Sequence, residues 1–283
     1  MTTVKKVAWI TDSSAYVPEK ERTHKDLYIV PMNISFGNKI YKDGIDISPD
    51  ELYVKMDEMK DIPKTSQPAL SDFIDLYTKL KHDYDEAIAV HISGNLSGTY
   101  NVSNLAAKLT NFPVEVIDSR ILSYPITMMI NKGMKLHSNG MEAKEIADIL
   151  RKEHTKYHNY ILVGKLEQLY KGGRINGIQK MIGSLLNIHP ILQINNGNVE
   201  IYKKSRTKNK AINTILEQFY IEKQKHTIKT VQVLHADAID EAKSIRDKLV
   251  RQYDDIDVLI GPISQTIGVH GGKGSLTMIW KVD

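Results

Sequence analysis

Short apolar runs of strand length alternate along the chain with longer segments whose apolar residues recur at helical spacing. Apolar runs of this kind cover residues 7–10, 86–92 and 114–117. Between the last two runs, residues 99–109 place small and apolar side chains three and four positions apart, which is typical of one face of a helix. The first part of the chain therefore predicts strands that alternate with helices.

The same criteria predict elements along the rest of the chain. An Asn-Gly pair at residues 196–197 predicts the turn of a hairpin. Further strands are predicted at residues 27–36, 40–43, 157–164, 189–194, 198–204, 227–234, 257–260 and 276–280. Further helices are predicted at residues 49–59, 72–80, 141–154, 166–170, 177–187, 208–223 and 240–251.

This order of elements predicts an α/β fold with two domains. A length of 283 residues exceeds a typical single core. We place an N-terminal α/β domain at residues 1–158, with a mostly parallel sheet flanked by helices. A C-terminal α/β domain follows at residues 159–283, with a mixed or antiparallel sheet and its own helices.

Composition narrows the function classes. Lysine and arginine outnumber aspartate and glutamate by only 38 to 34, so the overall charge does not predict nucleic-acid binding. The absence of cysteine excludes disulfides, thiol catalysis and cysteine-ligated metals. Neither a signal-peptide core nor a membrane-spanning window is present in the sequence, which predicts a cytoplasmic protein without stable membrane insertion.

Polar residues follow several predicted strands, at the edge where open α/β sheets place ligand groups. Strand 7–10 leads into Asp12 and Ser13, and strand 86–92 leads into the sequence Leu-Ser-Gly-Thr-Tyr at residues 96–100, called the LSGTY segment below. Ser97 is the expected N-cap of the following helix, whose unpaired N–H groups stabilise an anion. A purely local capping role fits Asp12 and Ser13 equally well.

Three further segments carry candidate binding residues. The loop at residues 64–68 holds Thr65 and Ser66 just before a proline. Paired glycines precede Arg174, and glycines surround His270, so the backbone at both places is free to approach a ligand. Surface charge is the ordinary alternative for such an arginine, and a structural role is the ordinary alternative for a single histidine.

Known catalytic motifs do not fit the spacing. The Gly272-Lys273 pair lacks the Ser or Thr that follows lysine in a P-loop. Ser97 stands one place late for a G-x-S-x-G nucleophile elbow, and no H-E-x-x-H-like metal spacing occurs. A hydrolase or phosphotransferase acting on acyl or phosphoryl groups through Ser97 or Asp12 remains the alternative hypothesis. No catalytic residue, metal or cofactor is predicted.

These segments together resemble the DegV family, the fatty-acid-binding subunits that serve bacterial fatty acid kinase. The resemblance implies two α/β domains that enclose one long-chain fatty acid in a tunnel between them. It also implies an ATP-dependent kinase as partner, which phosphorylates the bound acid to an acyl phosphate for phospholipid synthesis. The carboxylate-binding residues that it implies are Thr65, Ser66, Ser97, Arg174 and His270. Candidate further members of the polar pocket are Asp12, Ser13, Ser93 and Thr99.

The sequence departs from the family pattern at two places. Gly94 stands where the family commonly has a second serine before the LSGTY segment, which removes one hydroxyl donor. Lys273 stands where the family commonly has proline after its histidine, so a cation is added beside His270.

The role of the basic run at residues 203–210 has three interpretations. A solvated surface is the ordinary one. Nucleic acid or an anionic membrane surface is the second, and transient membrane contact stays open. Docking of the kinase through Lys204 and Arg206 is the third, and it is the one that accompanies the predicted carrier.

Overall fold

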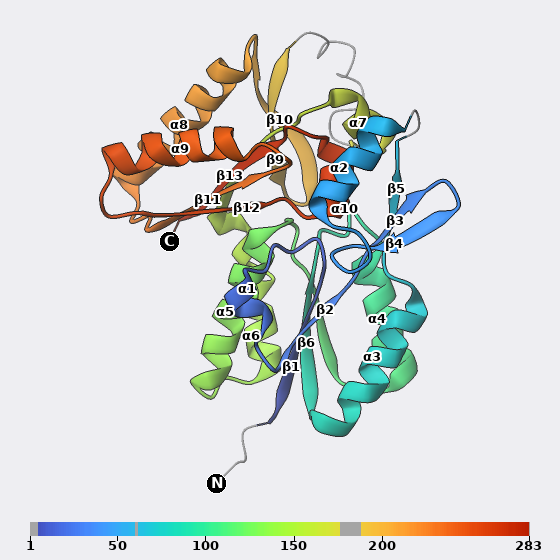
Figure 1. Ribbon diagram of the computed structural model, residues 1–283. Helices are drawn as coiled ribbons and strands as arrows, with labels where there is room; N and C mark the ends of the chain where they lie inside the picture. The colour runs from blue at the N-terminus through green and yellow to red at the C-terminus, as the bar shows by residue number, and fades with distance from the viewer. Residues whose placement is uncertain (1–4, 60–61, 176–187, 283) are drawn as a thin grey trace. The chain divides into compact units, whose positions relative to one another are not determined.

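The computed structural model describes residues 5–59, 62–175 and 188–282 (Figure 1). Contacts within the chain divide it into two compact units. Unit 1 comprises residues 1–46 and 65–155, and unit 2 comprises residues 47–64 and 156–283. Residues 47–64, which fall in the predicted N-terminal domain, therefore belong to the same unit as the C-terminal part of the chain. The domain boundary at residue 158 stays a prediction.

Unit 1 is built on a parallel sheet, as predicted. Its four described strands have the order β2-β1-β6-β7, and all three neighbouring pairs run parallel. A smaller sheet has the order β4-β3-β5. The strands are β1 (Val7–Asp12), β2 (Leu27–Val30), β3 (Asn33–Phe36), β4 (Lys39–Lys42), β5 (Lys64–Ser66), β6 (Glu86–His91) and β7 (Val114–Asp118). The helices are α1 (Glu19–Arg22), α3 (Leu70–Asp83), α4 (Thr99–Thr110), α5 (Tyr124–Ser138) and α6 (Ala143–Leu150), with a short 3-10 helix at Glu153–Lys156.

The single strand predicted over residues 27–36 is wrong. The chain forms β2 and β3 instead, and the two join different sheets. Pro31 lies between them and lacks the N–H that would continue a ladder, so the strand breaks there. The segment at residues 64–68, expected as a loop, contributes the short strand β5.

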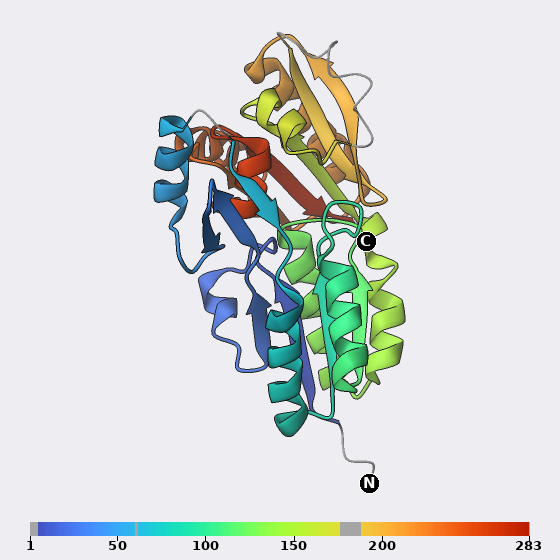
Figure 2. The same cartoon turned by 90° about the vertical axis from the view of Figure 1, so that its right-hand side faces the viewer.

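Helices cover both faces of the parallel sheet (Figures 1 and 2). Helices α3 and α4 lie on one face, and α5 and α6 lie on the other. Phe73 and Tyr77 of α3 are fully buried against Ile10 of β1 in one core cluster. On the opposite face, Trp9 packs against Gly133, where a Cβ would meet the indole ring at 2.5 Å.

Unit 2 has a mixed sheet, again as predicted. The described strands have the order β10-β9-β8-β13-β11-β12, antiparallel except for the β11–β12 pair. The strands are β8 (Tyr157–Leu162), β9 (His189–Asn195), β10 (Asn198–Ser205), β11 (Thr230–His235), β12 (Asp257–Pro262) and β13 (Leu276–Lys281). The helices are α2 (Pro49–Glu58), α7 (Leu166–Lys171), α8 (Lys208–Lys225), α9 (Ile239–Gln252) and α10 (Gln265–Gly271).

The core of unit 2 lies between this sheet and helices α8 and α9 (Figure 1). Helix α10 corrects the expectation of a glycine-rich loop around His270, which instead lies in the last turn of this helix. The helix predicted over residues 177–187 lies outside the described residues. Within the part of the chain that the structure describes, no helix combines the length and apolar character needed to cross a bilayer.

Candidate functional site

Asp12 lies at the carboxyl end of β1 and is fully buried. Its carboxylate accepts hydrogen bonds from the backbone N–H of Ile92 at 3.1 Å and from the backbone N–H of Ser14 at 3.0 Å. The Ser14 hydroxyl donates to the same carboxylate. These bonds tie the end of β1 to the end of the neighbouring strand β6.

His91 extends this network toward the helices on one face of the sheet. Its Nδ1 lies 3.1 Å from Asp12 Oδ2, and its Nε2 lies 2.9 Å from Ser103 Oγ on α4. Ser103 Oγ in turn lies 2.6 Å from the Tyr77 hydroxyl on α3. Every one of these side chains is fully buried. The network therefore links β1, β6, α3 and α4.

Burial alone would raise the pKa of Asp12. The hydrogen bond and charge of His91 oppose it, together with the hydrogen bonds from Ser14 and Ile92, and the net effect lowers the pKa below its usual range. The order carboxylate, imidazole, hydroxyl resembles that of a hydrolase triad. Since Ser103 is fully buried, no substrate reaches its hydroxyl, and we interpret the network as structural.

Helix α4 begins one residue later than expected. Its N-cap is Gly98, without a side-chain hydrogen bond, so Ser97 is not the N-cap. Ser97 Oγ instead lies 2.8 Å from Thr99 Oγ1 and accepts a hydrogen bond from the Thr99 backbone N–H at 3.3 Å. A Cβ on Gly98 would meet the Gln67 side chain at 3.1 Å. The segment that carries Thr65 and Ser66 therefore packs against the LSGTY segment.

The other unit 1 candidates differ in exposure. Ser93 and Thr99 are fully buried, whereas Ser66 is exposed and Thr65 is partly buried. The Ser13 hydroxyl donates to Asp43 Oδ2 at 2.9 Å and accepts from the Met32 backbone N–H at 3.0 Å. A ligand role for these residues stays a prediction, as it does for Asp12.

The departure at Gly94 has a local explanation. The Gly94 backbone N–H donates to Asp118 Oδ1 at 3.1 Å. A Cβ at position 94 would lie only 3.0 Å from Asp118 Oδ2, so a serine would require that carboxylate to shift. The glycine allows the ends of β6 and β7 to approach closely.

Arg174 and His270 approach each other within unit 2. The Arg174 Nη1 donates to the Gly172 carbonyl at 2.8 Å, and a Cβ on Gly172 would lie 2.1 Å from His270 Nδ1. Burial and the positive charge of Arg174 lower the pKa of His270 to about 4. The imidazole is therefore neutral near pH 7 and able to donate one hydrogen bond while Arg174 carries the charge.

The loop after His270 is fixed by backbone bonds and surface charges. The N–H groups of Gly164 and Lys165 donate to the Gly271 carbonyl at 3.0 and 3.1 Å. Lys273 Nζ lies 3.3 Å from an Asp57 oxygen on α2 and 2.8 Å from Asp237 Oδ2. The lysine that distinguishes this chain from the family pattern thus connects the His270 loop to α2.

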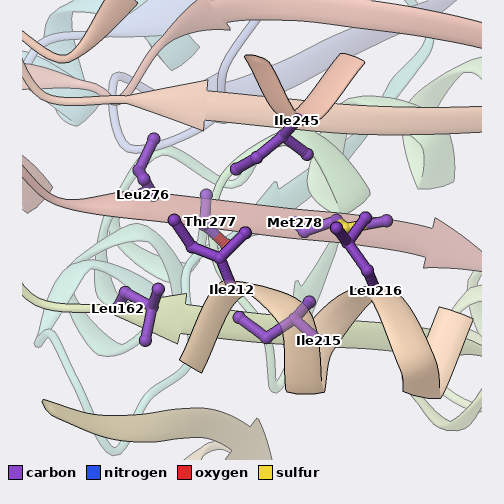
Figure 3. Close-up of a pocket in the computed structure, with 8 residues that line it drawn as sticks. All are labelled: Leu162, Ile212, Ile215, Leu216, Ile245, Leu276, Thr277 and Met278. Carbon is purple, nitrogen blue, oxygen red and sulfur yellow. The ribbon is translucent and has the colours of Figure 1, made fainter. Parts of the chain in front are cut away.

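An apolar pocket opens between the sheet of unit 2 and helices α8 and α9 (Figure 3). It holds roughly 240 Å³ of space without protein atoms, part of it open to solvent. Leucine, isoleucine and methionine supply all of its lining except Thr277. The lining residues are Leu162, Ile212, Ile215, Leu216, Ile245, Leu276, Thr277 and Met278.

Sequence reasoning missed this pocket and the His91 network. The pocket residues follow the apolar periodicity that is typical of any hydrophobic core, and this periodicity does not indicate where a pocket forms. His91 lies within a predicted strand, and only the pairing of β1 with β6 brings it to Asp12. Within the described residues, no group of three or more His, Asp or Glu side chains is arranged to hold a metal ion.

A family model described as an uncharacterised protein of the DegV family matches residues 6–282. A DegV domain-containing protein of Halalkalibacterium halodurans is 31% identical over 281 residues, covering 98% of this chain and 99% of the relative.

Solved structures share the fold. The chain is similar to DegV of Bacillus subtilis, a fatty acid binding protein, with a TM-score of 0.91 and 29% identity over 99% of this chain and 100% of that one. It is also similar in fold to the Fatty Acid Kinase (Fak) B3 protein of Streptococcus pneumoniae, solved with linoleic acid, with a TM-score of 0.83 and 19% identity over 98% of this chain and 100% of that one.

Proposed function

The chain belongs to the DegV family, and we propose that it binds one long-chain fatty acid and presents the carboxylate to a separate kinase. The solved DegV protein of Bacillus subtilis is a fatty acid binding protein. The proposal assigns this chain the role of a carrier, with the acid as its cargo.

The apolar pocket of unit 2 is the observation that carries the proposal. Each methylene group transferred from water into such a pocket contributes about 0.8 kcal/mol. Its lining side chains belong to the core of unit 2 apart from Thr277, so an acyl tail enters only as they move apart. The apolar lining favours an acyl tail and disfavours a polar substrate, which would lose its hydrogen bonds to water there.

Polar groups lie beyond one end of this pocket. Leu162 and Leu276 line that end, and Figure 3 shows them together on its left side. Leu162 leads into Gly164, whose N–H donates to the carbonyl of Gly271, the residue after His270. We assign Arg174 and His270 to the carboxylate, because a guanidinium and a neutral imidazole supply charge and a directed hydrogen bond.

The family resemblance adds Thr65, Ser66 and Ser97 of unit 1 as hydroxyl donors to the carboxylate. Their two segments pack against each other through Gln67 and Gly98, which supports treating them as one group. Ser97 is less well suited to act as a nucleophile, because His91, the nearest candidate base in sequence, bonds Ser103 instead.

Mass spectrometry of lipid extracted from the purified protein tests the binding proposal. We expect one fatty acid per chain, and we expect Arg174→Ala and His270→Ala to lower the affinity for added acid. Exposed Glu19→Ala serves as the matched control and is expected to leave occupancy unchanged. A folded protein that neither carries nor takes up a fatty acid contradicts the proposal.

Kinase presentation requires a separate test. Lys204 lies in β10 and Arg206 directly follows this strand; both are exposed, and we assign them to kinase docking. Charge reversal at both positions is expected to lower ATP-dependent phosphorylation of the bound acid while lipid occupancy stays unchanged. Loss of occupancy in this variant would instead indicate that the basic residues bind the ligand or a membrane surface.

A further inference from the structure

We propose that Ser123, together with the N-terminus of helix α5, is a further binding residue for the carboxylate of the fatty acid. The inference rests on the proposed function, because it assigns an additional group to the same ligand. Ser123 is not among the residues that the family resemblance implies. It lies in the segment that joins β7 to α5, at the carboxyl edge of the unit 1 sheet.

Ser123 is a buried serine whose hydroxyl is unsatisfied. The residue is only 1% exposed, and among the described residues its hydroxyl has no hydrogen-bond partner. A serine at the N-cap ordinarily accepts a hydrogen bond from an N–H of the first turn, and Ser123 forms none. Because a buried hydroxyl without a partner destabilises the folded protein, Ser123 Oγ is suited to a group that the ligand supplies.

Helix α5 adds a positive potential beside this hydroxyl. The helix has 15 residues, and its first turn contains no acidic side chain, so no carboxylate of the helix itself meets the N-terminal N–H groups. Pro125 has no N–H, and the Ile126 N–H donates to the Ser123 carbonyl at 3.1 Å. The Tyr124 N–H is therefore the backbone donor beside the Ser123 hydroxyl. Two neutral donors at the positive end of a helix suit a singly charged carboxylate.

The N-terminus of α5 lies where an open α/β sheet binds its ligand. In the order β2-β1-β6-β7, β2 follows β1 on one side and β7 follows β6 on the other, so the order reverses between β1 and β6. The ends of both strands are bonded to the start of α5. Ser93, which follows β6, donates its N–H to the Ile121 carbonyl at 3.0 Å. The Thr127 hydroxyl of α5 donates to the carbonyl of Tyr16, which follows β1, at 2.8 Å.

Ser93 also connects the Ser123 segment to the LSGTY segment. Its carbonyl accepts hydrogen bonds from the backbone N–H groups of Leu96 at 2.9 Å and Ser97 at 3.1 Å. One residue thus holds the LSGTY segment through its carbonyl and Ile121 through its N–H. Since Ile121 lies two residues before Ser123, these bonds bring Ser97 and Ser123 to the same part of the sheet edge.

Ser103 shows how a buried serine with a structural role differs from Ser123. The Ser103 hydroxyl lies 2.9 Å from His91 Nε2 and 2.6 Å from the Tyr77 hydroxyl, beneath α3 and α4. Ser123 is buried to a similar degree, but it lies at the edge of the sheet and has neither kind of partner. Packing alone therefore accounts for Ser103 and does not account for the Ser123 hydroxyl.

The backbone at Ser123 sharpens this argument. Its φ is 66°, in the left-handed region that favours glycine. A glycine at this position would relieve the backbone strain, and the only group lost would be the hydroxymethyl side chain. The backbone conformation thus gives no reason for a serine here, whereas binding through the hydroxyl does.

Isothermal titration of hexadecanoic acid into the lipid-free full chain tests the inference by affinity. Ser123→Ala is expected to weaken binding about tenfold to hundredfold, because a hydrogen bond to a charged group is lost. Ser123→Gly is expected to weaken binding by the same factor without lowering the midpoint of thermal unfolding, because glycine adopts this backbone conformation without strain. Exposed Ser138→Ala, at the other end of α5, is the matched control and should leave the affinity unchanged.

An isotope label on the carboxyl carbon of the acid gives a readout that follows the head group itself. The NMR resonance of the bound carboxylate reports its hydrogen bonds and its pKa. Loss of a donor that favours the charged form should raise the pKa of the bound acid and shift the resonance in both Ser123 variants. Ser138→Ala should keep the wild-type resonance and pKa.

The outcomes separate this inference from the proposed function. Wild-type protein that binds no fatty acid contradicts the proposed function, and the assignment of Ser123 falls with it. Wild-type protein that binds the acid, with affinity and carboxyl resonance unchanged in both Ser123 variants, overturns the inference alone. Weaker binding with an unchanged carboxyl resonance also overturns it, because the substitutions then act through the fold and not through the carboxylate.

Discussion

The sheet edge of unit 1 and the apolar layer of unit 2 differ in how their buried side chains interact. Around Asp12, buried polar groups satisfy one another through the Asp12–His91–Ser103–Tyr77 network. Between the unit 2 sheet and helices α8 and α9, aliphatic side chains line an apolar pocket whose one polar member is Thr277. A satisfied polar network fixes geometry, whereas apolar contacts are non-directional and let side chains rearrange.

This difference in side-chain interactions predicts which substitutions each unit tolerates without losing stability. In unit 1, each network member is the partner of another, so losing one leaves the rest buried without compensation. In unit 2, seven of the eight lining residues belong to the core cluster, but each makes non-directional apolar contacts instead of one required hydrogen bond. Changes in size there should alter ligand choice more than stability.

The largest expected effect comes from Asp12→Ala, which removes the charge around which the unit 1 network is built. We expect a loss of about 3–5 kcal/mol in the free energy of unfolding of unit 1, because His91 and two backbone N–H groups lose a buried partner. Urea denaturation measures it. Exposed Glu19→Ala is the control and should stay within about 0.5 kcal/mol of wild type. Equal stability of both variants would refute a structural role for the network.

Enlarging one isoleucine in each unit to phenylalanine tests this difference. Ile126→Phe on α5 overfills a fully buried site and is expected to destabilise by about 1–3 kcal/mol. Ile215→Phe on α8 directs the same ring into the pocket, where space exists, and should change stability by less. Thermal unfolding of both variants without fatty acid measures the difference. Equal destabilisation would argue that the pocket closes when empty.

His270 gives unit 2 a pH dependence. Its pKa is about 4 in the folded protein and about 6.5 when unfolded, so the unfolded chain binds the proton first as pH falls. The free energy of unfolding is therefore unaffected by this titration above pH 6.5 and falls as the pH is lowered from 6.5 toward 4. Between pH 7 and pH 5 we expect a loss of up to about 2 kcal/mol that His270→Gln does not show. Parallel pH profiles of the two proteins would refute this assignment.

Much of the fold was predictable from periodicity, and most of the differences have local physical causes. The parallel sheet of unit 1 and the mixed sheet of unit 2 follow the predicted order of elements. The strand break at Pro31 was readable, because proline cannot continue a ladder. Helix α10 was not, since its glycines favour a loop until packing overrides propensity.

The candidate site was predictable only as a set of residue types. The LSGTY segment, Arg174 and His270 stand out in the sequence because small and charged residues interrupt apolar patterning. His91 does not stand out, since its role depends on strand pairing between residues nearly eighty positions apart. The pocket depends on unfilled volume, which no sequence pattern reports.

The smallest expected effect concerns Lys273, the cation that this chain has in place of the family's usual proline. Its ion pairs with Asp57 and Asp237 involve side chains that are all more than 40% exposed, so Lys273→Ala should cost less than about 1 kcal/mol. The loss should shrink further in high salt. If the lysine positions the His270 loop, Lys273→Ala should lower fatty acid affinity more than it lowers stability. Lys171→Ala, which removes an exposed ion pair to Glu167, is the matched control. An equal and small effect of both variants on affinity would show that the lysine is surface charge alone.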